Sequence, residues 1–296
     1  MGFKKNLLHY KKNLFLGLLA ISLFSCSALG QWWYDRLDLY LANYFFKYAD
    51  FSNEQKTYVS SVTKDYLAWN SSSEIPKYRN LIIKIRALDE TTTTKDIQKL
   101  FEEGESMFKA SNDFFTPHIV RFTKTISETQ VKEINLFFEE RIKKWKESLD
   151  ETKYQNPQEQ IVKSTKRLAR FLGFRLSEEQ LITIKELSNK IVEPDTSYIE
   201  RQDIWNRELI SILRKRESQN FDVTLTNHLN GLLNFEGRGN RNLIYHEILA
   251  RIIASLDEDQ KKKFHKRLNF FISSLDKIIK NQDRKSTRLN SSHVKR

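Results

Sequence analysis

The feature of this chain that most constrains its fold is a helix start that occurs four times in nearly the same form. In each case an apolar residue precedes Ser or Asp, and Gln follows three residues later: Phe51-Ser52…Gln55, Ile126-Ser127…Gln130, Leu176-Ser177…Gln180 and Leu256-Asp257…Gln260. A Ser or Asp side chain at the N-cap accepts a hydrogen bond from the backbone N–H three residues on, while the Gln side chain reaches back to the N-cap N–H. The pattern predicts four helices, each beginning directly after its cap residue.

Apolar residues recur at intervals of three and four after these starts, which is the period of an amphipathic helix. The clearest stripe consists of Val131, Ile134, Phe137, Phe138, Ile142 and Trp145. Oppositely charged pairs four residues apart, such as Glu139 and Lys143, lie on the other face. With only 8 glycines and 4 prolines, the chain has long stretches without turn residues. We therefore predict an all-α fold, an elongated antiparallel multi-helix bundle.

We expect helices near 29–49, 52–70, 74–89, 95–112, 117–125, 127–149, 157–172, 177–192, 196–219, 222–234, 240–255 and 257–281. The polar link from Asp150 to Asn156 can divide the bundle into lobes at 27–150 and 156–282, and short connections leave one continuous bundle open. The N-caps at 52, 127, 177 and 257 are unevenly spaced. That spacing argues against a solenoid repeat.

The N-terminal segment is typical of a signal peptide. A basic region with four lysines precedes an apolar run from Leu14 to Phe24, which is shorter than the roughly 20 residues that span a bilayer, and the small residue Ser25 follows. We expect residues 1–25 to be removed.

Cys26, the only cysteine, follows that segment in Leu23-Phe24-Ser25-Cys26, which resembles the lipobox of bacterial lipoproteins, although Phe24 is bulkier than usual. The resemblance implies lipid attachment at Cys26 through a diacylglyceryl thioether and usually an added N-acyl chain, and two such signals anchor a protein stably in the bilayer. Ser27 stands where an aspartate would resemble an inner-membrane retention signal. We therefore expect the outer membrane, in its periplasmic leaflet or at the cell surface. The alternative is a free core thiol behind an uncleaved anchor.

The C-terminal residues Asp283 to His293 resemble the translation of a common sequencing adapter. We expect residues 283–296 to be non-native and the last native residue to lie near Gln282; the alternative is a basic disordered tail. The formal charge of +12 depends strongly on the two ends, since 1–25 holds four lysines and 283–296 holds five basic residues and one acid. The helical domain at 26–282 is therefore only weakly basic, and we expect no nucleic-acid partner.

Motifs that indicate chemistry are incomplete. His246-Glu247 resembles half of the H-E-x-x-H zinc motif, but Ala250 occupies the second ligand position. The segment Gly237–Gly239 has neither a preceding strand nor a following G-K-[ST]. We predict no catalytic residue, no metal site and no cofactor.

Aromatic residues follow Cys26 closely. Trp32, Trp33 and Tyr34 lie within eight residues of it, and aromatic side chains are enriched at the headgroup level of membranes. These three residues are possible membrane-proximal aromatics, which we expect to orient the helical domain on the bilayer. Packing of a first helix against the bundle is the equal alternative.

Several blocks are similar to an uncharacterised proteobacterial lipoprotein family, domain of unknown function 6279. They are Tyr34-Asp-Arg-Leu-Asp38, Tyr48-Ala-Asp-Phe-Ser52, Tyr66-Leu-Ala-Trp69, Glu74-Ile-Pro-Lys-Tyr78, Ser127-Glu-Thr-Gln-Val131 and Lys166-Arg-Leu-Ala-Arg-Phe-Leu-Gly173. The resemblance runs over essentially all of 21–282; Asn70 departs from it, since members often have histidine there. It implies a helical, membrane-anchored envelope protein and supplies no activity. A weaker resemblance, limited to the helix starts, is to small periplasmic helical chaperones that carry L-T-x-x-Q.

Two functions follow. The favoured one is a non-enzymatic interaction, scaffold or chaperone-like role for a lipoprotein that binds the lipid bilayer through Cys26 and has a possible envelope protein partner. The alternative is an envelope enzyme that acts on cell wall or lipid. A deep pocket that gathers Glu, Asp or His with perturbed pKa values would favour the enzyme.

Overall fold

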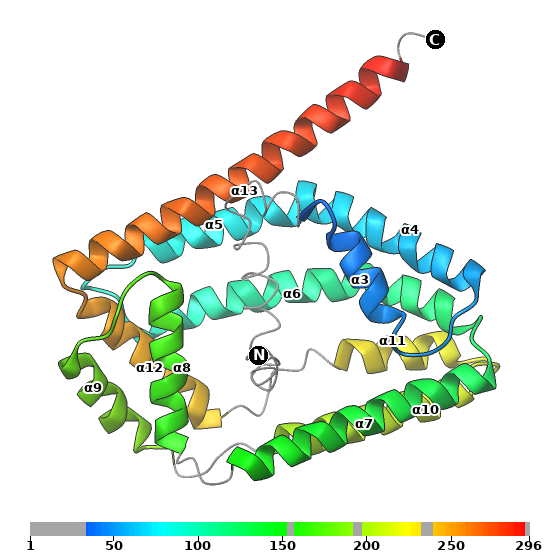
Figure 1. The fold of residues 1–296 in the computed structure, drawn as a ribbon, viewed down its shortest axis with the longest axis horizontal. Helices are drawn as coiled ribbons and strands as arrows, with labels where there is room; N and C mark the ends of the chain where they lie inside the picture. Colours follow the sequence, from blue (N-terminus) through cyan, green and yellow to red (C-terminus); the bar gives the residue numbers. More distant parts are fainter. Residues whose placement is uncertain (1–33, 153–156, 192–196, 232–238, 294–296) are drawn as a thin grey trace, which may run out of the picture.

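The computed structural model describes residues 34–152, 157–191, 197–231 and 239–293, and every regular element in these ranges is a helix. The all-α prediction is confirmed (Figure 1). The elements are α3 (Leu37–Phe45), α4 (Asn53–Trp69), the π-helix η2 (Asn70–Glu74), α5 (Ile75–Arg86), α6 (Thr94–Thr123), α7 (Glu128–Thr152), α8 (Pro157–Phe171), α9 (Glu178–Ser188), α10 (Ser197–Arg214), α11 (Phe221–Gly231), α12 (Gly239–Ala254) and α13 (Glu258–His293).

All four predicted helix starts are present, and each has the reciprocal capping bonds. The side chains of Ser52 and Ser177 each accept a hydrogen bond from the backbone N–H three residues on. The side-chain oxygen of the Gln at that position accepts a hydrogen bond from the N–H of the cap residue. Ser127 and Asp257 do the same. Each of these bonds satisfies a backbone donor that the first turn of a helix leaves open.

The first two glutamines also bind each other. Nε2 of Gln55 donates to Oε1 of Gln130 at 3.1 Å, and Nε2 of Gln130 donates to Oε1 of Gln55 at 2.7 Å. Each Nε2 donates further to a backbone carbonyl just before the other helix, at Thr125 (3.0 Å) and at Asp50 (2.9 Å). This first glutamine pair joins the starts of α4 and α7.

The other two glutamines repeat the arrangement. Gln180 and Gln260 exchange side-chain bonds of 3.1 and 3.0 Å, and each donates to a carbonyl before the other helix, at Ser255 (3.1 Å) and at Arg175 (2.6 Å). All four glutamines are buried. This second glutamine pair joins the starts of α9 and α13, so the uneven spacing of the caps conceals two equivalent pairs.

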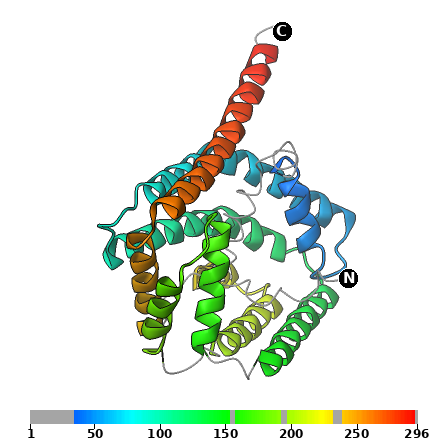
Figure 2. The same ribbon diagram turned by 60° about the vertical axis from the view of Figure 1, so that its left-hand side comes forward.

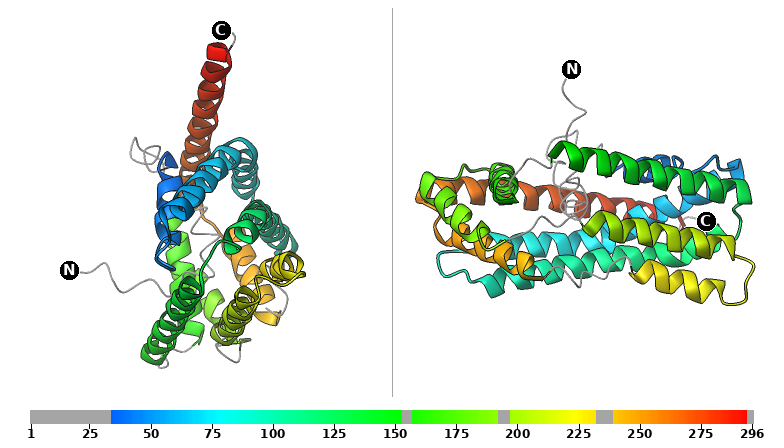
Figure 3. Two further views of the ribbon diagram at one scale, coloured as in Figure 1. Left: turned by 90° about the vertical axis from the view of Figure 1, so that its right-hand side faces the viewer. Right: turned by 90° about the horizontal axis from the view of Figure 1, so that it is seen from below.

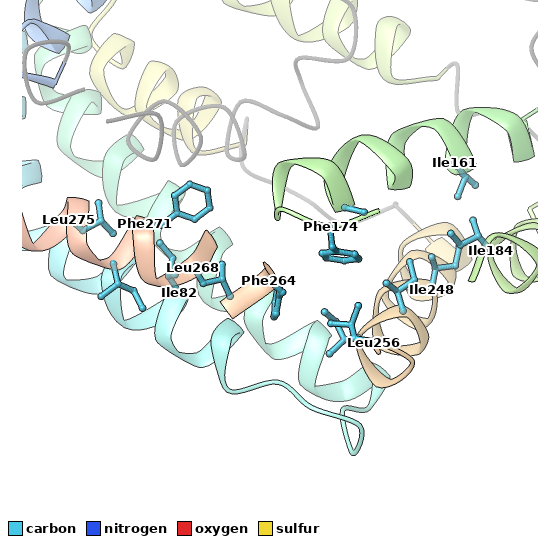
Figure 4. Close-up of a cluster of buried hydrophobic side chains, with 14 of the residues drawn as sticks. Ile82, Ile161, Phe174, Ile184, Ile248, Leu256, Phe264, Leu268, Phe271 and Leu275 are labelled. Carbon is cyan, nitrogen blue, oxygen red and sulfur yellow. The ribbon is translucent and has the colours of Figure 1, made fainter. Parts of the chain in front are cut away.

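Each pair is surrounded by its own hydrophobic core. The first core includes Phe51, Val131 and Leu225 and is supplied by α3, α4, α6, α7, α10 and α11. The second core includes Ile82, Ile184 and Phe264 and is supplied mainly by α5, α8, α9, α12 and α13. Figure 4 shows the second core, where α13 side chains meet Ile82 of α5.

Helices from before and after residues 150–156 therefore contribute to both cores. Helix α7 packs on α10, α13 packs on α5, and α6 contacts both α11 and α12 between them. The helices from α3 to α7 are therefore arranged much like the helices from α8 to α13, and the two sets have approximate two-fold symmetry (Figure 1). The predicted division near 150–156 stays a prediction, and the pairs α7 with α10 and α5 with α13 cross it.

Two local predictions were wrong. We expected a break between residues 112 and 117, with a new helix from Pro117, but α6 continues through both. Proline cannot donate to the carbonyl four residues earlier, at Asp113; because Pro117 is exposed, water can supply that bond. We also expected a gap between residues 70 and 74, but η2 fills it, so the chain is helical from α4 through to α5.

The helices α3, α7 and α8 lie on one broad face, which points toward the viewer in Figure 1, and α6 and α12 lie behind them (Figure 3). The C-terminal part of α13 extends past the other helices (Figure 2). Among the described residues, none of the helices combines the length and the apolar content needed to cross a bilayer.

Candidate functional site

The predicted lipid-attachment residue Cys26 and the aromatics Trp32 and Trp33 lie outside the described residues. Tyr34 is the first described residue, and its side chain is only 3% exposed. Its hydroxyl donates to Oδ1 of Asn70 at 3.0 Å. Tyr34 therefore packs inside the protein, as the core-packing alternative expects.

The helix that follows Tyr34 has an apolar outer surface. On α3, Leu39 and Tyr40 are 54% and 53% exposed, whereas Leu37 and Ala42 on the opposite side are buried. Tyr44 is also exposed, and its hydroxyl accepts from Arg141 of α7 at 2.7 Å. We call Leu39 and Tyr40 the α3 apolar surface. Exposed apolar side chains on the first described helix after a predicted lipid anchor are suited to a membrane interface.

A buried polar network lies next to α3, where the chain passes through η2. Asn70 accepts from Tyr34 and donates to the hydroxyl of Tyr66 at 3.4 Å, and that hydroxyl bonds Ser111 of α6 at 3.1 Å. A π-helix inserts an extra residue per turn and often marks a functional site. Here it turns Asn70 and Glu74 into the interior, so that both are buried.

Glu74 is the carboxylate of this network and is only 1% exposed. Its Oε1 accepts from Nζ of Lys77 at 2.6 Å, and its Oε2 has no hydrogen-bond partner among the described residues. A buried carboxylate oxygen without a partner is costly, because burial removes its hydration. The network therefore holds one polar atom that the described residues leave unsatisfied.

The tyrosines of the network are held in their neutral form. Burial raises the pKa of the Tyr34 hydroxyl well above its usual range. Burial likewise raises the pKa of Tyr66 and of Tyr78, and the charge of Glu74 adds to both increases. These hydroxyls can donate and accept hydrogen bonds, but phenolate chemistry is strongly disfavoured, so the arrangement fits positioning better than reaction.

The histidine of the incomplete zinc motif is also part of the packing. His246 is buried against the ring of Phe101, with centroids 4.6 Å apart, and burial lowers its pKa. Its neighbour Glu247 lies 3.6 Å from Lys190, and Ala250 is buried. Of the segment Gly237–Gly239, only Gly239 is described, as the first residue of α12. Among the described residues, His, Cys, Asp and Glu form no group of three that could hold a metal.

The described part of the chain has two surface hollows of note. One, of about 350 Å³, lies over the second glutamine pair and is lined by Gly173, Asp257, Gln260 and Lys263 among others. The other, of about 560 Å³, lies between α8 and α9 and contains four basic side chains and one carboxylate. The first hollow also contains the carboxylate of Asp259, and neither hollow contains a histidine.

A family model matches residues 47–233, which is more than half of the chain. The chain belongs to DUF6279, a family of unknown function. This result confirms the resemblance seen in the sequence. Searches of curated proteins and of solved structures gave no match.

The DUF6279 match includes the first glutamine pair, Asn70, Glu74 and Gln180, and it ends before Gln260 and α13. Sequence reasoning missed the buried network around Glu74. A signal was present, since Tyr34, Tyr66, Glu74 and Tyr78 all stand in the blocks that carry the resemblance, and the structure brings them together.

Proposed function

We propose that this DUF6279 protein is an outer-membrane lipoprotein, anchored through acylated Cys26, with a non-enzymatic interaction, scaffold or chaperone-like role toward an envelope protein partner. The observation that carries the proposal is the α3 apolar surface. Leu39 and Tyr40 are exposed on the first described helix, while Tyr34 and Leu37 beside them fill the interior.

The length of the chain before α3 supports membrane contact. Cys26 lies eight residues before Tyr34. A fully extended segment of eight residues spans at most about 28 Å, so an anchored Cys26 would keep α3 near the bilayer. Apolar and aromatic side chains on such a helix enter the headgroup region favourably. Trp32 and Trp33, which fall within that segment, belong to the same proposal.

The filled interior supports binding over catalysis. Two hydrophobic cores occupy the bundle, and the buried network consists of neutral hydroxyls, an amide and the carboxylate of Glu74, which accepts a bond from Lys77. Large apolar side chains are exposed on several other helices: Leu136, Ile182, Ile204, Val223, Leu243 and Phe270. Single exposed side chains of this kind are common. Here they supply the contact points that a helical scaffold needs.

Mass spectrometry of the protein extracted from membranes tests the anchor. We expect an N-terminal peptide that begins at Cys26 and carries acyl chains, and we expect Cys26→Ser to move the protein out of the outer-membrane fraction. A peptide that begins at unmodified Met1 would contradict the anchor.

The interaction role is tested with a chain that begins at Ser27. Every described core residue lies at Tyr34 or later, so this chain keeps all of the described buried contacts. We expect cross-linking of the native protein in cells to recover an envelope protein, and the purified chain to slow the aggregation of that partner. Failure of both measurements would contradict the interaction role.

A further inference from the structure

The hollow between α8 and α9 is a basic groove. It is lined by Gln158, Glu159, Val162, Lys163, Lys166, Arg170, Lys185 and Asn189, and we call it the α8/α9 groove. Lys163, Lys166 and Arg170 are spaced by three and four residues on α8, which places them on one side of that helix. Lys185 faces them from α9.

The four cations of this groove lack carboxylate partners among the described residues. In that part of the chain no ion pair involves Lys163, Lys166, Arg170 or Lys185, and Glu159 is the only carboxylate among the lining residues. Other basic residues are paired, such as Lys84 with Glu103 and Arg216 with Glu128. A concave site that gathers unpaired like charges raises the local concentration of anions.

Helix α8, which supplies most of the groove lining, lies on the same broad face of the bundle as helix α3 (Figure 1). Helix α3 and helix α8 are both at the front in Figure 1, and both lie on one side of α6 and α12 in Figure 3. A bilayer that contacts α3 would therefore meet the side of the molecule that carries α8. The half-buried Val162 adds an apolar element to the basic lining.

We propose that the α8/α9 groove binds the phosphate headgroups of anionic phospholipids in that bilayer. The inference rests on the proposed membrane attachment and adds a ligand class to it. Lys and Arg side chains interact with phosphate oxygens by charge-assisted hydrogen bonds. The volume of about 560 Å³ is sufficient for a glycerophosphate headgroup. The groove would then hold the body of the protein flat against the bilayer.

Vesicle flotation with the chain that begins at Ser27 tests this site without the lipid anchor. The vesicles are phosphatidylcholine alone, or phosphatidylcholine with phosphatidylglycerol. We expect binding only with phosphatidylglycerol, and we expect the triple variant Lys163→Gln, Lys166→Gln, Arg170→Gln to weaken it. One basic residue near an anionic surface contributes about fivefold, so the three together give a loss on the order of 100-fold in the partition coefficient.

A matched control removes the same charge elsewhere. Lys64, Lys95 and Lys99 are exposed on α4 and α6, and their triple glutamine variant should retain most of the binding. Equal losses in the two variants would assign binding to the overall charge and overturn the proposal. Equal binding to both kinds of vesicle would also overturn it, as would tighter capture of a soluble acidic protein than of the vesicles.

The proposals about the anchor and about the groove can be contradicted independently of each other. The mass of the Cys26 peptide reports on the anchor and is unaffected by the groove variant, whereas flotation of the Ser27 chain reports on the groove and is unaffected by acylation. Circular dichroism of the two triple variants shows whether each remains helical, and a folded groove variant that still floats would contradict the site.

Discussion

The two glutamine pairs make the same four hydrogen bonds in two different surroundings. Around the first pair, Phe45 stacks on Phe51 and both make edge contacts with Phe122, with ring centroids 5.2 to 5.3 Å apart. Around the second pair the core is mostly aliphatic, with Phe174 and Phe264 in edge contact. The same hydrogen bonds therefore form under aromatic and under aliphatic packing, because the partners of each glutamine are backbone carbonyls and the other glutamine.

The helices before each pair differ more than the pairs do. Helix α3 precedes the first pair and exposes Leu39 and Tyr40, while α8 precedes the second and exposes Lys163 and Arg170. Their places in the two-fold arrangement match (Figure 1). Buried hydrogen bonds fix how helices start and meet, whereas surface residues remain free to specialise. The helices from α3 to α7 can thus present an apolar surface, while those from α8 to α13 present a basic groove.

Removal of one glutamine should have the largest effect and tests whether the two pairs are equivalent. Gln130→Leu and Gln260→Leu each delete two side-chain bonds to the partner glutamine, one to a carbonyl and one capping bond. Because buried partners stay unsatisfied, we expect each variant to lose about 3–4 kcal/mol in the free energy of unfolding. Urea denaturation measures this.

The control for that measurement is Thr129→Leu, which places the same new side chain one residue earlier on the exposed side of α7. It should change stability by less than about 0.5 kcal/mol. A large loss at Gln130 with none at Gln260 would break the equivalence of the pairs.

A glycine found only near the second pair should have the next largest effect. Gly173 has a φ of 95° in the turn after α8, where a Cβ would lie 3.1 Å from the backbone oxygen of Lys263. We expect Gly173→Ala to cost about 2–3 kcal/mol, through backbone strain and this contact. Gly231→Ala has open space and should be neutral or slightly stabilising. Thermal unfolding compares the two, and similar melting temperatures would remove the distinction.

Tyr34→Phe tests the polar network that adjoins the first half. The change leaves Oδ1 of Asn70 without its donor, so we expect a loss of about 1–2 kcal/mol. Tyr40→Phe, on the exposed α3 apolar surface, should cost less than about 0.5 kcal/mol. Chemical denaturation of both proteins measures the difference; an unchanged Tyr34→Phe variant would show that the hydroxyl contributes nothing to stability.

The smallest expected effect concerns the loss of folding stability at acid pH, which we assign to His246 on α12. Burial lowers its folded pKa, against a smaller opposing effect of Glu102. The unfolded state therefore binds the proton more readily, and the stability from neutral His246 is full above pH about 6.5 and declines as the pH falls. His246→Phe should reduce the decline in the urea midpoint between pH of about 7.5 and about 5. His265→Gln, at an exposed position, is the control, and an unchanged decline in His246→Phe would contradict the assignment.

Much of the fold could be predicted because its signals are local. Capping boxes and apolar periodicity located the starts of α4, α7, α9 and α13 to the residue. Pro117 misled the prediction, since its effect depends on exposure to water, which the sequence does not state. The network around Glu74 could not be predicted, because the buried positions of Asn70 and Glu74 depend on the π-helical turn η2 and on its packing against α13.

The sequence by itself determined that the chain is all helical and where its main helices begin, because a capping bond needs residues only three apart. It also indicated a lipid anchor at Cys26. Only the tertiary structure decided that Gln55 binds Gln130 and that Gln180 binds Gln260, across 75 and 80 residues. The capping bond uses only the side-chain oxygen of each glutamine, so the partners of its amide N–H groups are set by how whole helices pack and bury it.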